Sequence, residues 1–147
     1  MEGSRMRSAY PVALAEEEGN IVVRSRDLPE LLTFGDDQAD ALVNAEDALE
    51  VVLLSYAEKA MPIPEPSPPA PGEHLVFVSA QVGAKLAVIE AFRVAGISKS
   101  ELARRMGVAE GEARRVLDPD YGSKLDKLEL AARALGRRLV VALEEAA

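Results

Sequence analysis

Apolar residues that alternate with small or polar ones open the chain, and this pattern predicts three short β-strands. These runs lie at Ala9–Leu14, Ile21–Arg24 and Leu31–Phe34. Turn-forming residues over 16–20 and a loop over 26–30 separate them. Pro11 has no backbone N–H, so we expect the first strand to lie at a sheet edge or to begin there. We expect residues 1–8 to be a disordered lead-in.

A helical repeat then predicts one long helix that continues to about Ala60. Asp37 places a carboxylate where the N-cap is needed. The apolar stripe consists of residues spaced three or four apart, namely Leu42, Ala45, Leu49, Val52 and Tyr56. A helix lying across a small antiparallel sheet buries both apolar faces. Such a unit buries little surface, so we expect a further strand or an oligomer contact.

Proline dominates residues 61–73, which predicts an extended and stiff linker. A ligand for an SH3-like groove is the alternative interpretation of this segment. The apolar run Leu75–Val78 follows and predicts a strand, placed within residues 74–79, that returns to the first sheet.

Helical periodicity returns at Ser79 or Ala80 and predicts a helix to Ala95 that ends at Gly96. The stretch Ser98–Leu117 then has the layout of a helix-turn-helix. Ser98 is a candidate N-cap at capping-box spacing from Glu101, and Gly107 is suited to the tight turn between two short helices. An ordinary helical hairpin in a hydrophobic core is the alternative.

A last helix is expected to begin after Ser123, as its N-cap, and to end at Gly136, with Leu125, Leu128, Ala132 and Leu135 on its apolar face. The run Leu139–Leu143 is β-branched and too short to predict a helix, so we expect a terminal strand. A strand there has no partner in a helical module, so we expect it to pair with its copy in a second subunit. This places Leu139, Val140, Val141 and Leu143 in a homodimer or homotetramer contact.

The net charge of −8 divides unevenly along the 147 residues. Residues 1–79 carry 5 Lys or Arg against 15 Asp or Glu, whereas residues 80–147 carry 12 against 10. An acidic surface suits a basic protein partner, and a mildly basic module tolerates phosphates. The two halves therefore differ in the partners they favour.

Candidate catalytic chemistry is sparse. There is no cysteine, so disulfides and thiolate metal sites are excluded, and no apolar run reaches the length of a membrane span. The single histidine, His74, is expected to be solvated at the end of the linker. Asp27, Asp36, Asp37 and Asp40 could suggest a metal site, but turn and capping roles explain them more simply. We therefore expect a cytoplasmic protein that is not an enzyme and needs no cofactor or metal.

Short motifs occur in a characteristic order from about Ala9 to Leu143. In the first half they are Tyr10-Pro11, the Gly19 turn, Asp27-Leu-Pro29, Thr33-Phe-Gly-Asp36, Ala41–Leu49, Ile63-Pro64 and Pro66-Ser-Pro68. In the second half they are Lys85-Leu86, Gly96-Ile-Ser98, Glu101–Arg105, Gly107-Val108, Leu117-Asp-Pro119 and Ala134–Leu139. No single motif is specific, but their order and spacing resemble the HicB family, the antitoxins of HicA–HicB toxin–antitoxin systems.

This resemblance implies an α+β protein with two functional ends. Residues 1–60 would form a partial ribonuclease-H-like domain, a small antiparallel sheet with one long helix, that binds a HicA-type toxin, a small basic protein that cleaves mRNA. Residues 80–147 would form an all-α helix-turn-helix domain, with the short terminal strand, that binds operator DNA as an oligomer and represses the operon.

The motifs depart from the family at two places. Glu30 stands where the family often has glycine after Asp-Leu-Pro. Ala109 and Glu110 open the second motif helix, where related proteins commonly have Ser and Gln. Carboxylates at Glu110 and Glu112 would oppose phosphates unless one accepts a hydrogen bond from a cytosine amino group.

The candidate DNA-binding residues are Lys99, Ser100, Glu110, Gly111, Arg114 and Arg115. The candidate toxin-binding residues combine acidic loop and helix positions with two apolar anchors: Glu17, Asp27, Glu30 and Asp47, with Tyr10 and Leu31. Two alternatives remain open. One is a helix-turn-helix regulator whose first domain senses a ligand or only oligomerises, and the other is a purely protein-binding module.

Overall fold

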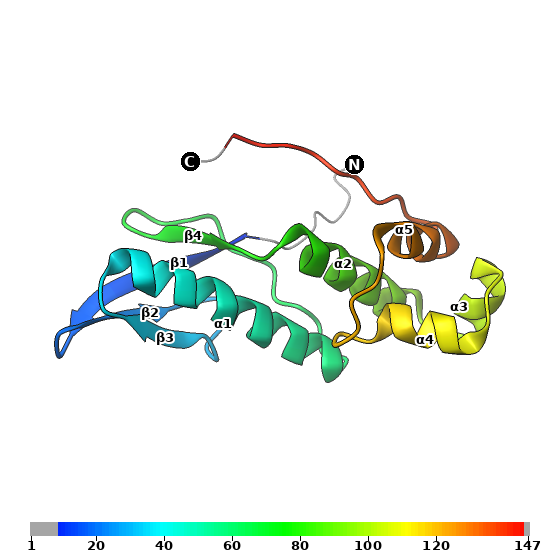
Figure 1. Cartoon of the computed structure of the whole chain (residues 1–147), viewed down its shortest axis with the longest axis horizontal. Helices are drawn as coiled ribbons and strands as arrows, with labels where there is room; N and C mark the ends of the chain where they lie inside the picture. Colours follow the sequence, from blue (N-terminus) through cyan, green and yellow to red (C-terminus); the bar gives the residue numbers. More distant parts are fainter. Residues whose placement is uncertain (1–8, 146–147) are drawn as a thin grey trace.

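The structure, a computed structural model, describes residues 9–145, so the expected lead-in over residues 1–8 lies outside the described residues. The α+β class is confirmed (Figure 1). In chain order the elements are β1 (Ala9–Glu17), β2 (Asn20–Arg24), β3 (Leu32–Gly35), α1 (Gln38–Glu58), β4 (His74–Phe77), α2 (Ala80–Ala95), α3 (Lys99–Met106), α4 (Glu110–Leu117) and α5 (Leu125–Ala134).

The four strands form one antiparallel sheet in the order β3-β2-β1-β4. β1 is a central strand, yet Pro11 faces a partner only in β4, because pairing with β2 begins at Ala13. The expectation of an edge strand is thus wrong for β1 as a whole, although Pro11 needs no N–H toward β2. Glu18 and Gly19 turn β1 into β2 with φ angles of 51° and 85°, as a two-residue hairpin requires.

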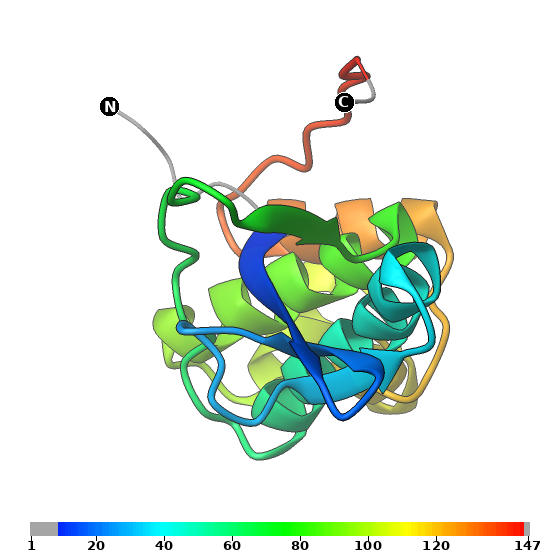
Figure 2. The same ribbon diagram turned by 90° about the vertical axis from the view of Figure 1, so that its left-hand side faces the viewer.

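α1 lies against one face of the sheet (Figure 2). The side chain of Asp37 accepts a hydrogen bond from the backbone N–H of Asp40 and caps the helix, as predicted. The buried row is shifted from the predicted stripe: Ala41, Ala45, Leu49, Leu53 and Ala57 face the core, while Leu42, Val52 and Tyr56 flank it. The prediction favoured large residues, whereas small alanines bring the helix close to the strands.

The proline-rich segment, residues 61–73, has neither helix nor strand, as expected. It runs back along the sheet half, which consists of β1–β4 and α1, and it reaches β4 before the chain enters α2. The side chain of Ile63 is buried in the core of the sheet half, and the Tyr10 hydroxyl donates a hydrogen bond of 2.6 Å to the carbonyl of Pro64. The strand that follows is confirmed as β4, which pairs with β1.

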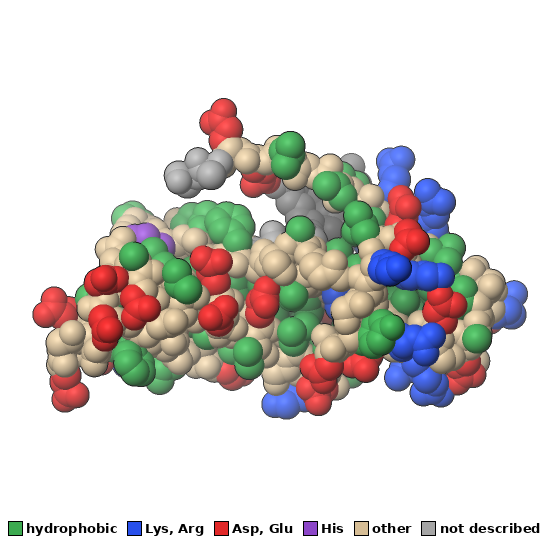
Figure 3. Space-filling model, viewed as in Figure 1, with side chains coloured by type: hydrophobic (Ala, Val, Ile, Leu, Met, Phe, Trp, Pro, Cys, Tyr) green, Lys and Arg blue, Asp and Glu red, His purple; other side chains and the backbone are tan. Residues whose placement is uncertain are grey.

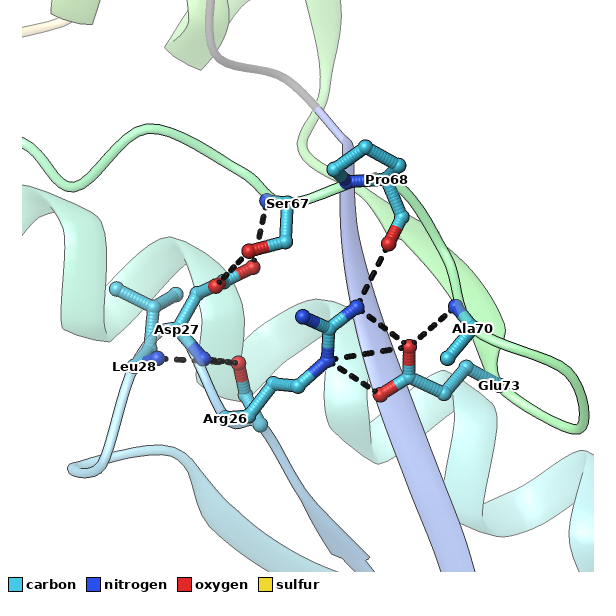
Figure 4. A network of polar contacts seen from close by, with 8 residues as sticks. Arg26, Asp27, Leu28, Ser67, Pro68, Ala70 and Glu73 are labelled. Carbon is cyan, nitrogen blue, oxygen red and sulfur yellow. Dashed lines mark hydrogen bonds and ion pairs between the residues drawn. The ribbon is translucent and has the colours of Figure 1, made fainter.

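A polar network fastens this segment to the loop after β2 (Figure 4). Asp27 accepts hydrogen bonds from the backbone N–H and the hydroxyl of Ser67, at 2.9 and 2.6 Å. Arg26 donates to the carbonyl of Pro68 and pairs with Glu73. The Arg26 guanidinium and the N–H of Ala70 hold the pKa of the Glu73 carboxyl at about 2, well below its usual value.

The chain has two hydrophobic cores among its described residues, and α2 contributes to both. This helix lies between the sheet and the helices α3, α4 and α5 (Figure 1). Leu86 belongs to the core of the sheet half, against which Val82 also packs. Ala84 and Val88 belong to the core of the helical half, formed with α3, α4 and α5. The two halves are therefore joined by shared packing on one helix.

In the helical half, the predicted cap is confirmed at α3 but wrong at α5. Ser79 and Ser98 accept hydrogen bonds as N-caps. Lys124 is at the N-cap position of α5, and Ser123, the predicted cap, is buried with its hydroxyl bonded to Lys85. Leu125, expected on the apolar face, is 53% exposed.

The predicted terminal strand is absent from the described part of the chain, because residues 135–145 form neither helix nor strand. Leu139 packs against the helical core, whereas Val140, Val141 and Leu143 are exposed. This segment extends away from α5 (Figure 2). A strand needs a neighbouring strand to hold its backbone hydrogen bonds, and residues 9–145 place none beside this segment.

We expect Gly35→Ala to destabilise the protein, because a Cβ there would clash with the backbone nitrogen and Cα of Ala41. β3 would have to move away from α1, at a cost of about 3 kcal/mol or more in the free energy of unfolding. Gly111→Ala is the matched control, since its nearest contact is an Arg115 side-chain nitrogen at 3.7 Å. Urea denaturation measures both variants, and equal midpoints would contradict the close approach of β3 and α1.

Candidate functional site

In the helical half, which consists of α2–α5, the two short helices α3 and α4 are joined by a turn at Gly107. Gly107 has a φ of 72°, which ends α3 in the left-handed conformation, and Val108 packs partly buried against the core below. Ala113, Val116 and Leu117 of α4 face that core. Two short helices joined by a glycine turn therefore lie where the sequence predicted them.

Lys85, from α2, holds the C-terminal end of α4. Its side chain is nine-tenths or more buried, and its ammonium donates hydrogen bonds to the carbonyls of Arg115 and Val116, at 2.9 and 2.8 Å. A third hydrogen bond of 2.6 Å reaches the hydroxyl of Ser123. The last carbonyls of a helix have no partner within the helix, so this ammonium satisfies them.

The surroundings of Lys85 affect its ionisation. Burial away from water disfavours the charged form and lowers the pKa of Lys85 to about 8, while Asp118 acts weakly in the opposite direction. The ring of Tyr121 lies 6.0 Å from the ammonium and 5.9 Å from the guanidinium carbon of Arg115. Sequence reasoning did not assign Lys85 a role. The available signal was a lysine between the apolar residues Ala84 and Leu86.

Glu110 and Glu112, which seemed opposed to DNA, are engaged with neighbouring groups. Glu110 accepts a hydrogen bond of 2.8 Å from Ser100 of α3 and pairs with Arg114 at 2.6 Å. Both contacts lower the pKa of the Glu110 carboxyl. Glu112 pairs with Lys127 of α5 at 2.5 Å. The two carboxylates lie on opposite flanks of α4, and each joins it to a neighbouring helix.

Between these flanks, the outer side of α4 presents Gly111, Arg114 and Arg115, because successive helical residues are 100° apart. All three are exposed. Lys99 is exposed at the first residue of α3, and Ser100 follows it. The six DNA-binding candidates thus lie on α3 and α4, with Ser100 and Glu110 bonded to each other.

In the sheet half, two of the residues predicted to contact a toxin have almost no exposed surface. Tyr10 is 0% exposed and Leu31 is 1% exposed, so both belong to the core. Tyr10 belongs to the same buried cluster as Leu49 and Leu53 of α1. The two residues were interpreted as apolar surface anchors, but here they complete the small core.

The four acidic candidates differ in what they contact. Asp27 anchors Ser67, Glu17 pairs with Arg24 at 2.5 Å, and Glu30 accepts a hydrogen bond of 2.8 Å from the Tyr56 hydroxyl. Asp47 lies exposed on the outer side of α1. Glu17 and Glu30 are also exposed, whereas Asp27 is committed to the proline-rich segment.

Sequence reasoning missed the apolar surface beside these acids. A shallow groove of about 210 Å³ lies at the C-terminal end of α1, lined by Val51, Val52, Tyr56 and Met61 among others. Val43 and Val51 are 57% and 69% exposed on the same helix. Val43 and Val51 lie outside the apolar stripe predicted for this helix, and this was the signal that the sequence offered for an apolar surface.

His74 is half-buried and not fully solvated, which corrects the expectation from the sequence. One ring nitrogen lies 3.2 Å from the side-chain amide of Gln38, and the other has no hydrogen-bond partner among the described residues. Within residues 9–145, no group of three or more histidine or acidic side chains is placed to hold a metal ion. In the same part of the chain, no helix has the length and apolar character needed to cross a membrane.

Charge is divided in space as it is along the sequence (Figure 3). Acidic side chains are spread over α1 and the sheet half, while Lys and Arg side chains gather over α3, α4 and α5. The molecule therefore presents an acidic end with exposed valines and an end where arginines and lysines are concentrated.

Comparison with known proteins finds a matching family model and relatives that cover most of the chain. The family described as "HicB_like antitoxin of bacterial toxin-antitoxin system" matches residues 9–87, which extend from β1 into α2. The chain is 38% identical to Antitoxin HicB of Escherichia coli K12 over 131 residues, covering 88% of this chain and 95% of that protein. It is 38% identical to Antitoxin HicB 1 of Photorhabdus laumondii, over 92% of this chain and 86% of that protein. It is also 32% identical to Antitoxin HicB of Pseudomonas fluorescens over 99% of this chain and all of that protein.

The lowered pKa of Lys85 predicts an unusual dependence of stability on pH. Between the folded pKa of about 8 and the ordinary value of 10.5, the unfolded chain binds more protons at this residue than the folded chain. The contribution of Lys85 to the free energy of unfolding therefore rises with pH in this window, by up to about 3 kcal/mol. Urea denaturation from pH 7.5 to 10.5 measures this rise relative to Lys85→Met, and parallel pH profiles of the two proteins would contradict it.

Proposed function

This chain belongs to the HicB-like antitoxin family of bacterial toxin–antitoxin systems, and on that premise we propose that it neutralises a toxin with one end and represses its operon with the other. The toxin is a small basic mRNA-cleaving protein of the HicA type, bound by the sheet half. The operator is bound by α3 and α4. Binding alone carries out both roles in the cytoplasm, without catalysis.

The observation that carries this proposal is the division of charge between the two ends of one molecule. An acidic surface attracts a basic partner and repels nucleic acid, so α1 and its surroundings favour a protein ligand. The exposed cations of α3 and α4 favour the DNA backbone. A basic toxin and an acidic operator are thus directed to different ends of the chain.

We place the main toxin contact on the outer side of α1. Val43, Asp47 and Val51 follow one another at intervals of four residues and form one exposed row. Glu46 is exposed next to this row, and the groove beside Tyr56 and Met61 continues it. Apolar residues surrounded by acids offer both buried area and charge complementarity to a basic surface.

We propose that the operator is bound by two or more copies, joined partly through the run Leu139–Leu143. Val140, Val141 and Leu143 are 75%, 76% and 102% exposed. Pairing of this run with the same run of a second copy supplies the missing strand neighbour and covers these side chains. Two copies would also double the number of exposed cations available to one duplex.

Asp47→Lys is expected to weaken toxin binding about tenfold or more, because it places a like charge against the basic partner. Glu129→Lys, on the exposed side of α5, is the control with the same change of charge. The measurements are the dissociation constant for the HicA-type protein encoded beside this gene and the rate of its mRNA cleavage. Equal affinities of the two variants would place the contact elsewhere, and no binding by the unmodified chain would refute the antitoxin–toxin pairing.

Val141→Asp is expected to shift the protein toward a monomer, because a buried carboxylate in the paired strands has no partner. Sedimentation velocity measures the change, with Val94→Asp as the control, since Val94 is 60% exposed at the end of α2. A dimer or tetramer that survives Val141→Asp would exclude the terminal run as its contact.

A further inference from the structure

Glu110 occupies a place in α4 where a carboxylate is unexpected for DNA binding, and its contacts suggest why it is there. One of its oxygens accepts the hydrogen bond from the Ser100 hydroxyl at 2.8 Å. The other accepts from a terminal nitrogen of Arg114 at 2.6 Å. Ser100 belongs to α3, so three side chains from two helices form one continuous hydrogen-bonded chain.

The chain ends on an exposed guanidinium. The side chain of Arg114 is 57% exposed and that of Glu110 is 44% exposed, one helical turn apart on α4. Arg114 lies toward the outer side of α4, away from the buried Ala113 and Val116. An arginine without a partner samples many rotamers, whereas Glu110, itself fixed by Ser100, limits the positions that Arg114 occupies.

We propose that Arg114 reads a guanine in the major groove and that Glu110 is the residue that positions it, with Ser100 orienting Glu110. The proposal rests on the proposed DNA binding and adds the base that is recognised. It assigns Glu110 a favourable role in sequence recognition, although its charge opposes contact with phosphates.

The remaining donors of Arg114 are sufficient for this task. A guanidinium has five N–H groups, and Glu110 engages one of its terminal nitrogens. The free N–H groups can form the two parallel hydrogen bonds to O6 and N7 of guanine, which is the commonest specific contact of arginine with DNA. Direct reading of cytosine by Glu110 is less suited, since both of its oxygens already accept hydrogen bonds.

The pair also has a distinctive electrostatic consequence. Glu110 and Arg114 together carry no net charge, so they contribute little to the attraction that any phosphate backbone exerts. Their contribution is to choose between base pairs. Removing the charge of Glu110 should therefore strengthen binding to arbitrary DNA while weakening the preference for guanine.

Glu110→Gln tests this separation, with Glu112→Gln as the matched control. Both variants remove one negative charge from the first turn of α4, but Glu112 pairs with Lys127 and does not contact Arg114. The full-length proteins select duplexes from a randomised library at fixed salt. Fluorescence anisotropy then measures affinity for the selected duplex, for the same duplex with the guanine replaced, and for arbitrary DNA.

We expect the unmodified protein to prefer guanine at one position about 5- to 150-fold, the range that one bidentate contact provides. Glu110→Gln should lose most of this preference and bind arbitrary DNA more tightly. Glu112→Gln should also bind arbitrary DNA more tightly but keep the preference. Equal guanine preferences in these two variants would overturn the positioning role.

Arg114→Met tests the guanine contact itself, because methionine is also an unbranched side chain but has no hydrogen-bond donor. A duplex with 7-deazaguanine at the selected position lacks the N7 acceptor and should bind the unmodified protein less tightly, with no effect on Arg114→Met. If the unmodified protein selects a sequence in which Arg114→Met loses no guanine preference, the guanine assignment is wrong and DNA binding stands. If it binds no duplex even at low salt, the proposed operator binding fails and this inference with it.

Discussion

α2 belongs to two hydrophobic cores at once, and the position of every other functional element depends on this shared packing. Leu86 closes the core of the sheet half, and Val88 closes that of the helical half. Lys85, next to Leu86, holds the last turn of α4 through its hydrogen bonds. The helix proposed to read DNA is therefore held at a defined position relative to the sheet proposed to bind a toxin, without a flexible connection between the two ends.

The proline-rich segment makes this arrangement feasible. A chain that left α1 directly for α2 would leave β1 without β4 as a partner along its first residues. The segment instead follows the sheet half, held by Tyr10, Asp27 and Glu73. Asp27, which the sequence suggested as a toxin contact, thus helps to fix the path of this segment. The segment itself has few backbone hydrogen bonds.

Local patterns predicted the order of strands and helices well, because alternation, caps and glycine turns act over a few residues. Asp37 and Ser98 cap their helices as the sequence predicted, and α2 begins at Ala80, one of its two predicted starts. Side-chain roles that depend on distant contacts were harder to predict. Tyr10 is buried under a segment more than fifty residues away, and the buried hydroxyl of Ser123 bonds Lys85 of α2. Neither relation leaves a local signal.

The candidate surfaces show the same limit. Asp27 and Glu110 were both identified from their charge, yet one fixes a loop and the other lies between Ser100 and Arg114. The division of charge between the halves was visible in the sequence because it is a sum over many residues. The terminal strand stays a prediction for the oligomer, as do the division of the chain at residue 80 and the toxin and operator themselves.

Hydrogen–deuterium exchange of the full chain tests most directly whether the two ends bind different partners. With the HicA-type protein, we expect slower exchange in α1 and the adjacent sheet and unchanged exchange in α3 and α4. With operator DNA, we expect slower exchange in α3 and α4 and unchanged exchange in α1. Protection of α3 and α4 by the toxin with α1 unaffected, or protection of α1 by DNA, would contradict this expectation.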